Sequence, residues 1–445
     1  MTSQIILEQR QHFVKLPFVR TSAMEQILVF GPFALLLFGP LAFGAVSPLP
    51  IFVLEAGSAL LFFLWIIHQA KSGELSFQWN PVFAPMLAFA GIVGLQLLSG
   101  QTAYRQATYS SAMLYIAYGL LCFLITQMLR QTYHLRTLAV TASIYGFAIA
   151  IFAVLQSVSS DEKLYWVHIP RNGGWIYGPY VNHNHYAGLM EMLIPIPLVI
   201  GLSHLANRTM QRLAVISAAI MAATIFLSGS RGGMIAFLVQ LSVLAFFAIR
   251  RTGKFRVNWM AGLFPIILVC LLMWLGGSEF TNRVSTIHTE MRSELSGGMR
   301  MNIVRDGLKM FRQKPILGYG LGTFSDVYPR FRSFYSEVWI NEAHNDYIQL
   351  LVETGALGFV AMLWFFWTTY SEAAKKISNW TDDRDGTLAL IALLGCTGIL
   401  VHSLVDFNLQ IPANAAIFYV LCTLAAMEPR FRQTPTRTSS FSPSV

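Results

Sequence analysis

The chain has few charged side chains for its length. Asp, Glu, Lys and Arg together make up 12% of the residues, whereas a soluble globular domain has about 25%. Apolar residues make up 55% of the chain, and the mean hydropathy is +0.53. This composition excludes an ordinary soluble domain and predicts a protein with many membrane-spanning segments.

Cysteine is also scarce. Cys122, Cys270, Cys396 and Cys422 all fall inside apolar blocks. Their spacing matches neither a zinc site nor a disulfide framework, so we interpret them as small core residues. Residues 1–20 are polar and lack the apolar core and small-residue cleavage site of a signal peptide, so we expect no cleaved leader.

Twelve apolar runs are long enough to cross a bilayer, which takes about 20 residues of helix. Continuous apolar runs favour helices, since the strands of a membrane barrel would alternate. We therefore expect an all-α polytopic membrane protein with about 12 transmembrane helices. The predicted spans are residues 26–46, 50–69, 81–98, 111–129, 136–156, 186–204, 212–229, 233–249, 258–275, 348–370, 387–408 and 411–427.

The one long hydrophilic stretch separates the ninth span from the tenth. We call residues 276–347 the polar island and expect it to be partly helical. The predicted organisation is an N-terminal tail (1–25), nine spans (26–275), the polar island, three spans (348–427) and a C-terminal tail (428–445).

The basic residues are distributed unevenly between the two sides that these spans define. Of the 31 Lys and Arg residues, 18 fall in segments on the side of the N-terminus, four in the other short segments and nine in the polar island. Short cytoplasmic loops are enriched in Lys and Arg, whereas long loops translocate largely regardless of charge. We therefore expect both termini in the cytoplasm and the polar island outside. The net charge of +9 then follows from topology and does not indicate nucleic-acid binding.

Two shorter polar segments are predicted on the same outer face as the island. One is the loop 157–185, which ends with Asn182, Asn184 and His185. The other is the turn Ser-Gly-Ser-Arg-Gly-Gly at 228–233, which contains Arg231. A guanidinium group binds phosphate oxygens in bidentate fashion, so Arg231 is a candidate anion ligand. The alternative is an arginine that reaches to lipid headgroups from a helix end.

Within the island, residues 299–313 are predicted to form an amphipathic helix, which Pro315 follows. Arg305 and Lys309 lie on a flank of its apolar stripe. Most basic residues of the island are expected to form a solvated or headgroup-facing surface, with one or two acting as anion ligands.

The island ends with a His and two acids at the mouth of a span. Asp346 and Glu353 are seven residues apart and share one helical stripe with Gln349. An acid inside an apolar span costs a few kcal/mol, so Glu353 is a candidate for function, for support of the site or for a structural hydrogen bond. His344 is expected in a loop or first turn; it suits a general base, and its alternative is a structural role.

Two further pairs have structural interpretations. His402 and Asp406 are four residues apart in the span 387–408, so they are predicted to pair on one helical face as a polar lock. Asp383 and Asp385 have the spacing of a metal motif, but the topology puts them in a cytoplasmic loop. We therefore expect no metal site.

The sequence resembles the O-antigen ligase/polymerase superfamily in three segments. The first is His-Asn-Asp-Tyr-Ile-Gln at 344–349, followed by Glu353 and by glycines at 355 and 358. The second is the turn 228–233. The third is an island with an arginine, a helix and the glycine-rich segment 315–324. Twelve spans with a large outer loop between the ninth and tenth also resemble that family's layout.

The resemblance implies a GT-C-like glycosyltransferase of the bacterial inner membrane whose active site faces the periplasm. Its donor would be a glycan on undecaprenyl diphosphate. Its acceptor would be a sugar hydroxyl, on lipid A-core in the ligases or on another lipid-linked glycan in the polymerases. The transfer would need no metal or cofactor and would invert the anomeric centre. Lipid bilayer and these two substrates are the expected partners.

The resemblance also assigns roles to residues. Arg231 and Arg300 would bind the diphosphate, and His344 would activate the acceptor. Val304 stands where the family often has Trp, four residues after the island arginine, so Arg305 is the alternative diphosphate ligand. The residues expected to support the site are Asn182, Asn184, His185, Asn345, Asp346, Gln349 and Glu353.

Two alternative functions stay open at this point. The segments 181–188 and 405–414 are similar to those of relatives that assemble polysaccharides, which favours a repeat-unit polymerase. A lipid or sugar transporter, or a flippase, is the alternative from another class. Transporters often bind substrate near the membrane midplane between internal repeats, whereas this chain has its polar residues on one face and no evident repeat.

Overall fold

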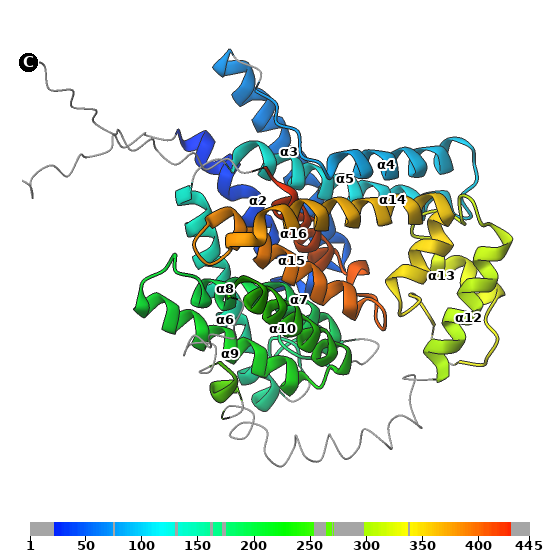
Figure 1. Cartoon of the computed structure of the whole chain (residues 1–445). Helices are drawn as coiled ribbons and strands as arrows, with labels where there is room; N and C mark the ends of the chain where they lie inside the picture. Colours follow the sequence, from blue (N-terminus) through cyan, green and yellow to red (C-terminus); the bar gives the residue numbers. More distant parts are fainter. Residues whose placement is uncertain are drawn as a thin grey trace, which may run out of the picture.

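The computed structural model of the chain is all-helical in the part that it describes (Figure 1). Nine helices in that part are long and apolar enough to cross a membrane, and two shorter helices are also apolar. The prediction of an all-α polytopic membrane protein is confirmed. The span predicted at 258–275 lies largely outside the described residues. These residues are 22–73, 76–129, 132–160, 163–170, 175–252, 264–268, 270, 298–336 and 339–428.

The helices follow the apolar runs closely, with breaks where proline or a polar residue interrupts them. The predicted span 186–204 is two helices that meet at Pro195, which lacks the amide N–H of a continuous helix. The helix bounds are α2 Ala23–Leu41, α3 Pro48–Ser72, α4 Phe83–Leu98, α5 Arg105–Met128, α6 Thr132–Ser159, α7 His183–Leu193, α8 Pro195–Leu202, α9 Arg208–Ser228, α10 Arg231–Thr252, α12 Gly298–Gln313, α13 Phe324–Val327, α14 Asp346–Lys376, α15 Arg384–His402 and α16 Pro412–Ala426.

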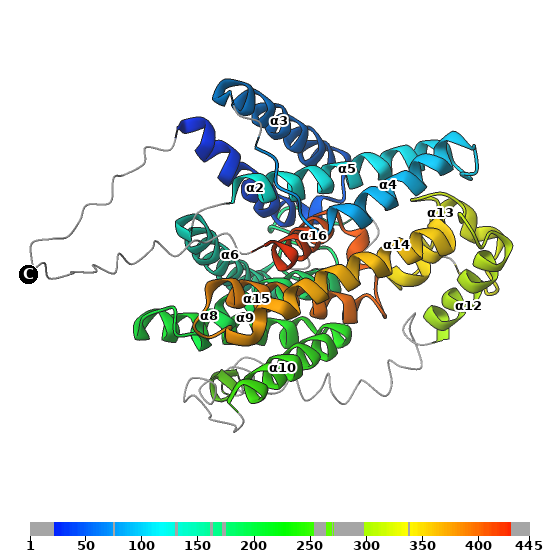
Figure 2. The ribbon, with the colours of Figure 1, turned by 45° about the horizontal axis from the view of Figure 1, so that its top comes forward.

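Helix α15 lies at the centre of the bundle. It packs against α7, α10, α14 and α16, and nearly all of its residues are buried (Figure 2). Gln240 of α10 fills the space beside Gly398 and donates hydrogen bonds to Glu191 O (2.7 Å) and Leu394 O (2.8 Å). Small residues and interhelical hydrogen bonds are what hold helices together in a membrane, where apolar burial gives little drive.

One end of the bundle collects the polar segments. There Asn184 of α7 donates a hydrogen bond to Asp406, which follows α15. His183, also on α7, has its Nδ1 2.8 Å from Ser228 O at the end of α9. Gln96, near the end of α4, donates to Leu317 O of the polar island. We call this end the His344 end. The three polar segments that were expected on one face therefore lie together.

Helices α12 and α13 project beside the start of α14 (Figure 1). The amphipathic helix predicted at 299–313 is confirmed by α12, whose buried face includes Ile303 and Met310. The buried Asp306 accepts hydrogen bonds from Lys309 Nζ (2.9 Å) and from Ser333 N and Oγ (both 2.9 Å). Burial raises the pKa of Asp306, but these bonds outweigh it and hold the pKa below its ordinary value. The carboxylate thus ties the island segments to one another.

The polar island is anchored in a break of α14. Gly355 has φ 64° and ψ −167°, so the helix is interrupted there. The segment 315–322 fills the break: Ala356 N donates to Pro315 O (2.8 Å), and Tyr319 N donates to Val352 O (3.0 Å). Backbone groups that the break leaves without helical partners are thereby satisfied.

Replacing Gly355 by alanine should loosen this attachment. A Cβ at Gly355 would lie 2.3 Å from Ile316 O, and its left-handed φ alone costs a non-glycine residue about 1–2 kcal/mol. We expect a lower midpoint of thermal unfolding and faster proteolysis within the island. Gly91→Ala is the control, because a Cβ there meets no atom within 4 Å. Equal stability of the two variants would contradict this role of the break.

Candidate active site

The chain leaves the helical conformation after His402, earlier than predicted. Helix α15 ends at His402, and residues 403–411, which we call the 403–411 loop, precede α16. The predicted helical pairing of His402 with Asp406 is wrong. His402 Nδ1 instead lies 2.7 Å from Glu191 Oε1 of α7, and both side chains are buried. The loop conformation is held partly from α14, since Asp346 N donates to Ser403 O (3.0 Å).

Asp406 is the centre of a group of side chains that come from distant parts of the chain. Asn184 Nδ2 donates to its Oδ2 at 2.5 Å. Arg300 Nη2 lies 3.8 Å from Oδ2, and His344 Nδ1 lies 3.7 Å from Oδ1. The Asp406 side chain is 1% exposed, whereas those of Arg300 and His344 keep 30% and 23%. We call these four residues the Asp406 corner; its buried acid faces a guanidinium group and an imidazole ring that both remain partly exposed.

His344 is held in an unusual conformation. Its φ is 51°, in the left-handed region that non-glycine residues seldom adopt and that is enriched at functional sites. Its ring packs edge-on against Phe407, with centroids 4.9 Å apart. At 3.7 Å its Nδ1 is too far from Asp406 for a direct hydrogen bond. The expectation of a loop position for His344 is confirmed.

Two buried nitrogen atoms at the corner have unused hydrogen-bonding capacity. Within the described residues, neither Arg300 Nε nor His344 Nδ1 has a hydrogen-bond partner. Most buried polar atoms in proteins are satisfied, and the exceptions concentrate at functional positions. Arg300 does donate from Nη1 to Val405 O (2.6 Å), so its side chain is fixed while part of the guanidinium group stays available.

The charge of Asp406 is stabilised by its surroundings. Burial raises the pKa of its carboxyl group, but the interaction with His344 and the nearby His185, Arg300 and His402 outweigh burial. Together they hold the pKa of Asp406 well below its ordinary value. The corner therefore contains a carboxylate throughout the physiological pH range, which can orient His344 and Arg300.

Four helix N-termini meet around the 403–411 loop. Three of them, those of α7, α12 and α14, donate side-chain hydrogen bonds to the loop. The donors are Asn184, Arg300 and Asn345, and Asn345 Nδ2 donates to Leu404 O (2.8 Å). The fourth is α10, where a Cβ on Gly232 would lie 2.7 Å from His402 Nε2 and 3.0 Å from Val405. Helix N-termini carry partial positive charge and unpaired N–H groups, so their convergence favours an anion.

Arg231 is the first residue of α10 and directly precedes Gly232. The predicted tight turn is present: α9 ends at Ser228, and Gly229 has a φ of 75° that returns the chain toward α10. Because Gly232 packs on His402, the turn brings the backbone of Arg231 to the edge of the Asp406 corner. Arg305, in contrast, lies on the exposed face of α12.

A sequence model of known proteins matches a region that contributes two of the four residues of the Asp406 corner. The model of the O-antigen ligase family matches residues 216–363. This match supports membership of the O-antigen ligase/polymerase superfamily. The O-antigen ligase match includes Arg231, Arg300 and His344, whereas Asn184 and Asp406 lie outside it. No curated protein matches the chain.

Two of the residues expected to support the site cap helix starts, and a third binds the 403–411 loop. Asn182 caps α7 by accepting from Asn184 N (2.9 Å), and Asn345 caps α14 by accepting from Ile348 N (3.0 Å). The Asp346 carboxylate accepts from Leu409 N (3.0 Å) and Gln410 Nε2 (3.1 Å) of the 403–411 loop. These bonds connect the ligase-family motif at 344–349 to Asp406, which is distant in sequence.

Two further residues that were expected to support the site lie in different places. His185 is buried, and its ring packs edge-on against Phe407 with centroids 4.7 Å apart, on the inner side of the corner. Glu353 lies away from the corner, where it accepts from Gly322 N (2.8 Å) and Phe324 N (3.2 Å). Glu353 therefore holds the segment 315–322 and the start of α13.

Gln349 fixes the backbone next to His344. Its Oε1 accepts from Ala343 N (2.9 Å), and its Nε2 donates to the carboxylate of Glu342. Sequence analysis missed Glu342, although an acid two residues before His344 was a usable signal. Within the described residues, no group of three or more His, Cys, Asp or Glu side chains could hold a metal ion.

Glu342 should make stability depend on pH. Burial raises the pKa of Glu342 from 4.5 to about 8, with Gln349 opposing the shift and Glu353 and Asp346 adding to it. Between these values the folded state binds more protons than the unfolded state, so this group lowers stability as pH rises. In wild type the midpoint of thermal unfolding should fall between pH 5 and pH 8, and in Glu342→Gln it should fall less steeply. The exposed Glu428, changed to Gln, is the control; equal slopes for both variants would refute the shift.

Proposed function

We propose that the protein transfers a glycan from undecaprenyl diphosphate to a sugar hydroxyl of a glycan acceptor, as an O-antigen ligase does. The observation that carries this proposal is the Asp406 corner. It joins an accessible histidine, a buried carboxylate and an arginine at a point where four helix N-termini meet. Membership of the superfamily supports the same reaction class.

The diphosphate is the group that these cations fit. A diphosphate carries several negative charges and becomes a good leaving group once they are neutralised. Arg300 and Arg231 supply permanent positive charge, and the helix N-termini supply oriented N–H groups. Fixed donors of this kind stabilise charge that develops in the transition state. The chain's own residues therefore suffice for leaving-group stabilisation.

His344 would act on the acceptor. Its imidazole takes the proton from the acceptor hydroxyl while the hydroxyl oxygen forms a bond to the anomeric carbon. The bond from that carbon to the diphosphate oxygen breaks, and its electron pair leaves with the diphosphate. Asp406 orients the imidazole and stabilises the positive charge that it gains. A single displacement of this kind inverts the anomeric centre.

The location of the corner supports this enzyme over a transporter. The corner lies at one end of the bundle, whereas transporters often bind their substrates near the membrane midplane. The bias of Lys and Arg in the sequence supports both termini in the cytoplasm and the His344 end at the periplasmic face of the bacterial inner membrane. Lipid-linked glycan would be presented at that face, with lipid A-core or another glycan as acceptor.

Arginine variants test the diphosphate site. In purified protein, Arg300→Gln should lower kcat/KM for the lipid-diphosphate donor by about 10²-fold, because one of its charge-stabilising donors is lost. The KM for the acceptor should change little. Arg305→Gln is the matched control on the same helix and should keep near-native transfer. A full rate in Arg300→Gln, or an equal loss in both variants, would contradict the assignment.

A further inference from the structure

Helix α7 buries an acid about two turns beyond its start. This residue is Glu191, whose Oε1 lies 2.7 Å from Nδ1 of His402, and the two side chains are 0% and 1% exposed. Ionisable side chains inside a membrane span are costly, and where they occur they pair with one another and mark functional positions. The transfer mechanism proposed above uses neither residue, and both lie outside the match at 216–363.

The first turn of α10 packs directly on this pair. A Cβ at Gly232 would lie 2.6 Å from Cδ2 and 2.7 Å from Nε2 of the His402 ring. A Cβ at Gly233 would lie 3.2 Å from Glu191 Oε1. Glycine at both positions permits this close approach. The start of α10, with Arg231 as its first residue, therefore rests on the pair.

His402 also holds the start of the 403–411 loop. Its carbonyl oxygen accepts hydrogen bonds from Val405 N (3.0 Å) and Asp406 N (3.1 Å). Asp406 is thus attached through the backbone to the residue whose ring supports Arg231. One residue therefore links the turn that carries Arg231 to the carboxylate that faces His344.

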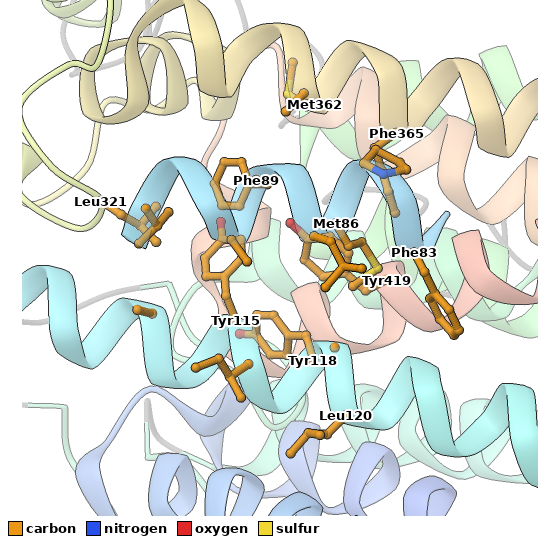
Figure 3. Close-up of a pocket in the computed structure, with 18 of the residues that line it drawn as sticks. Phe83, Met86, Phe89, Tyr115, Tyr118, Leu120, Leu321, Met362, Phe365 and Tyr419 are labelled. Atoms are coloured by element: carbon orange, nitrogen blue, oxygen red, sulfur yellow. The ribbon is translucent and has the colours of Figure 1, made fainter. Parts of the chain in front are cut away.

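The far end of the 403–411 loop is fixed separately. There Asp346 accepts from Leu409 N (3.0 Å) and Gln410 Nε2 (3.1 Å). Leu409 and Gln410 also line an apolar pocket, whose walls include Tyr115 and Tyr419 (Figure 3). These contacts attach the loop to α14, whereas the Glu191–His402 pair attaches it to α7 and α10.

We propose that Glu191 and His402 are positioning residues that hold Arg231 at a fixed distance from the Asp406 corner. Glu191 anchors the His402 ring, and the ring supports the start of α10. Arg231 then meets the diphosphate while His344 meets the acceptor. This inference rests on the transfer reaction and on the diphosphate role of Arg231 proposed above. Such alignment affects rates strongly, since a misplacement of about 1 Å can cost about 10²-fold.

Gly232→Ala tests the contact between α10 and the pair. Glu191 keeps the His402 ring from turning aside, so the added methyl group should displace the start of α10. In purified protein we expect the Kd for polyprenyl diphosphate and the KM of the lipid-linked donor both to rise about tenfold, and the acceptor KM to stay within roughly twofold. Gly91→Ala is the control, because a Cβ there meets no atom within 4 Å.

A double-mutant cycle shows whether this effect passes through the pair. His402→Ala removes the ring that the new methyl group would strike. In that background Gly232→Ala should change the Kd for polyprenyl diphosphate by less than about twofold. An equal tenfold loss in both backgrounds would overturn the proposal.

Glu191→Gln provides a milder variant, which decides the question if His402→Ala does not fold. Glutamine keeps the size of the side chain and a hydrogen bond to His402, but without the charge this bond is weaker. We expect the Kd for polyprenyl diphosphate to rise about threefold, with the acceptor KM unchanged. A wild-type Kd in Glu191→Gln, equal to that of the exposed control Glu428→Gln, would contradict the proposal.

Transfer by wild type, measured in the same preparation, separates this inference from the proposed function. If wild type transfers glycan and Gly232→Ala matches Gly91→Ala, the positioning proposal is wrong while the function stands. If Gly232→Ala raises the acceptor KM instead, or lowers only the midpoint of thermal unfolding, the pair does not position Arg231. If wild type forms no product, the proposed function fails, and this inference fails with it.

Discussion

Replacing His344 by alanine should lower the rate of glycan transfer by about 10²- to 10⁴-fold, the range that general bases contribute. The imidazole is the accessible base beside Asp406, and alanine cannot take the proton of the acceptor hydroxyl. The Arg300 guanidinium group is unchanged, so the affinity for the lipid-diphosphate donor should stay within a few-fold of wild type. Single-turnover transfer and donor binding, measured on the same purified protein, separate these two effects.

His204 provides a matched control at the opposite end of the bundle. Its Nδ1 lies 2.8 Å from Asp382 Oδ1, so it forms a second His–Asp pair, but its side chain is 62% exposed. His204→Ala should keep the native transfer rate. Native transfer by His344→Ala, with folding intact, would show that His344 is not the base.

Replacing Asp406 by asparagine should lower transfer by about 10³-fold, because the carboxylate that orients His344 is lost. Asparagine has nearly the same shape, so the contact with Asn184 can persist while the charge facing Arg300 and His344 disappears. We expect a decrease in kcat that exceeds any change in donor KM. Steady-state kinetics together with thermal unfolding of the variant check this result.

The control again comes from the other end of the bundle. Asp382→Asn removes the partner of His204 and should leave kcat unchanged. If Asp406→Asn transfers glycan at the native rate, Asp406 is only structural. If Asp406→Asn unfolds, the more conservative Asn184→Ala, which removes one hydrogen bond to Asp406, should still lower kcat by a measurable factor.

The helices could be predicted from the sequence because their signals are local. Long apolar runs predict spans, and the spacing of Met301, Val304, Leu308 and Phe311 predicts α12. The turn before Arg231 was also recognisable, because glycine at 229 supplies the left-handed φ that ends α9. These features depend on residues within a few positions of one another.

The role of Asp406 could not be predicted in the same way. Its spacing from His402 suggested a helical pair, yet its partners Asn184, Arg300 and His344 are separated from it by tens to hundreds of residues. Only the packing of α7, α12 and α14 around the 403–411 loop brings them together. The position of Glu353 shows the same limit: its bonds to Gly322 and Phe324 depend on how the island docks in the break of α14.

The most direct test is the product balance of the purified wild-type protein. It would be supplied with a polyprenyl-diphosphate-linked glycan and a glycan acceptor, and both products would be quantified by mass spectrometry. We expect elongated acceptor and free polyprenyl diphosphate in equal amounts, with His344→Ala forming both about 10²- to 10⁴-fold more slowly. Absence of elongated acceptor in wild type, together with movement of labelled lipid-linked glycan across vesicle membranes, would contradict the proposed transferase and favour a transporter.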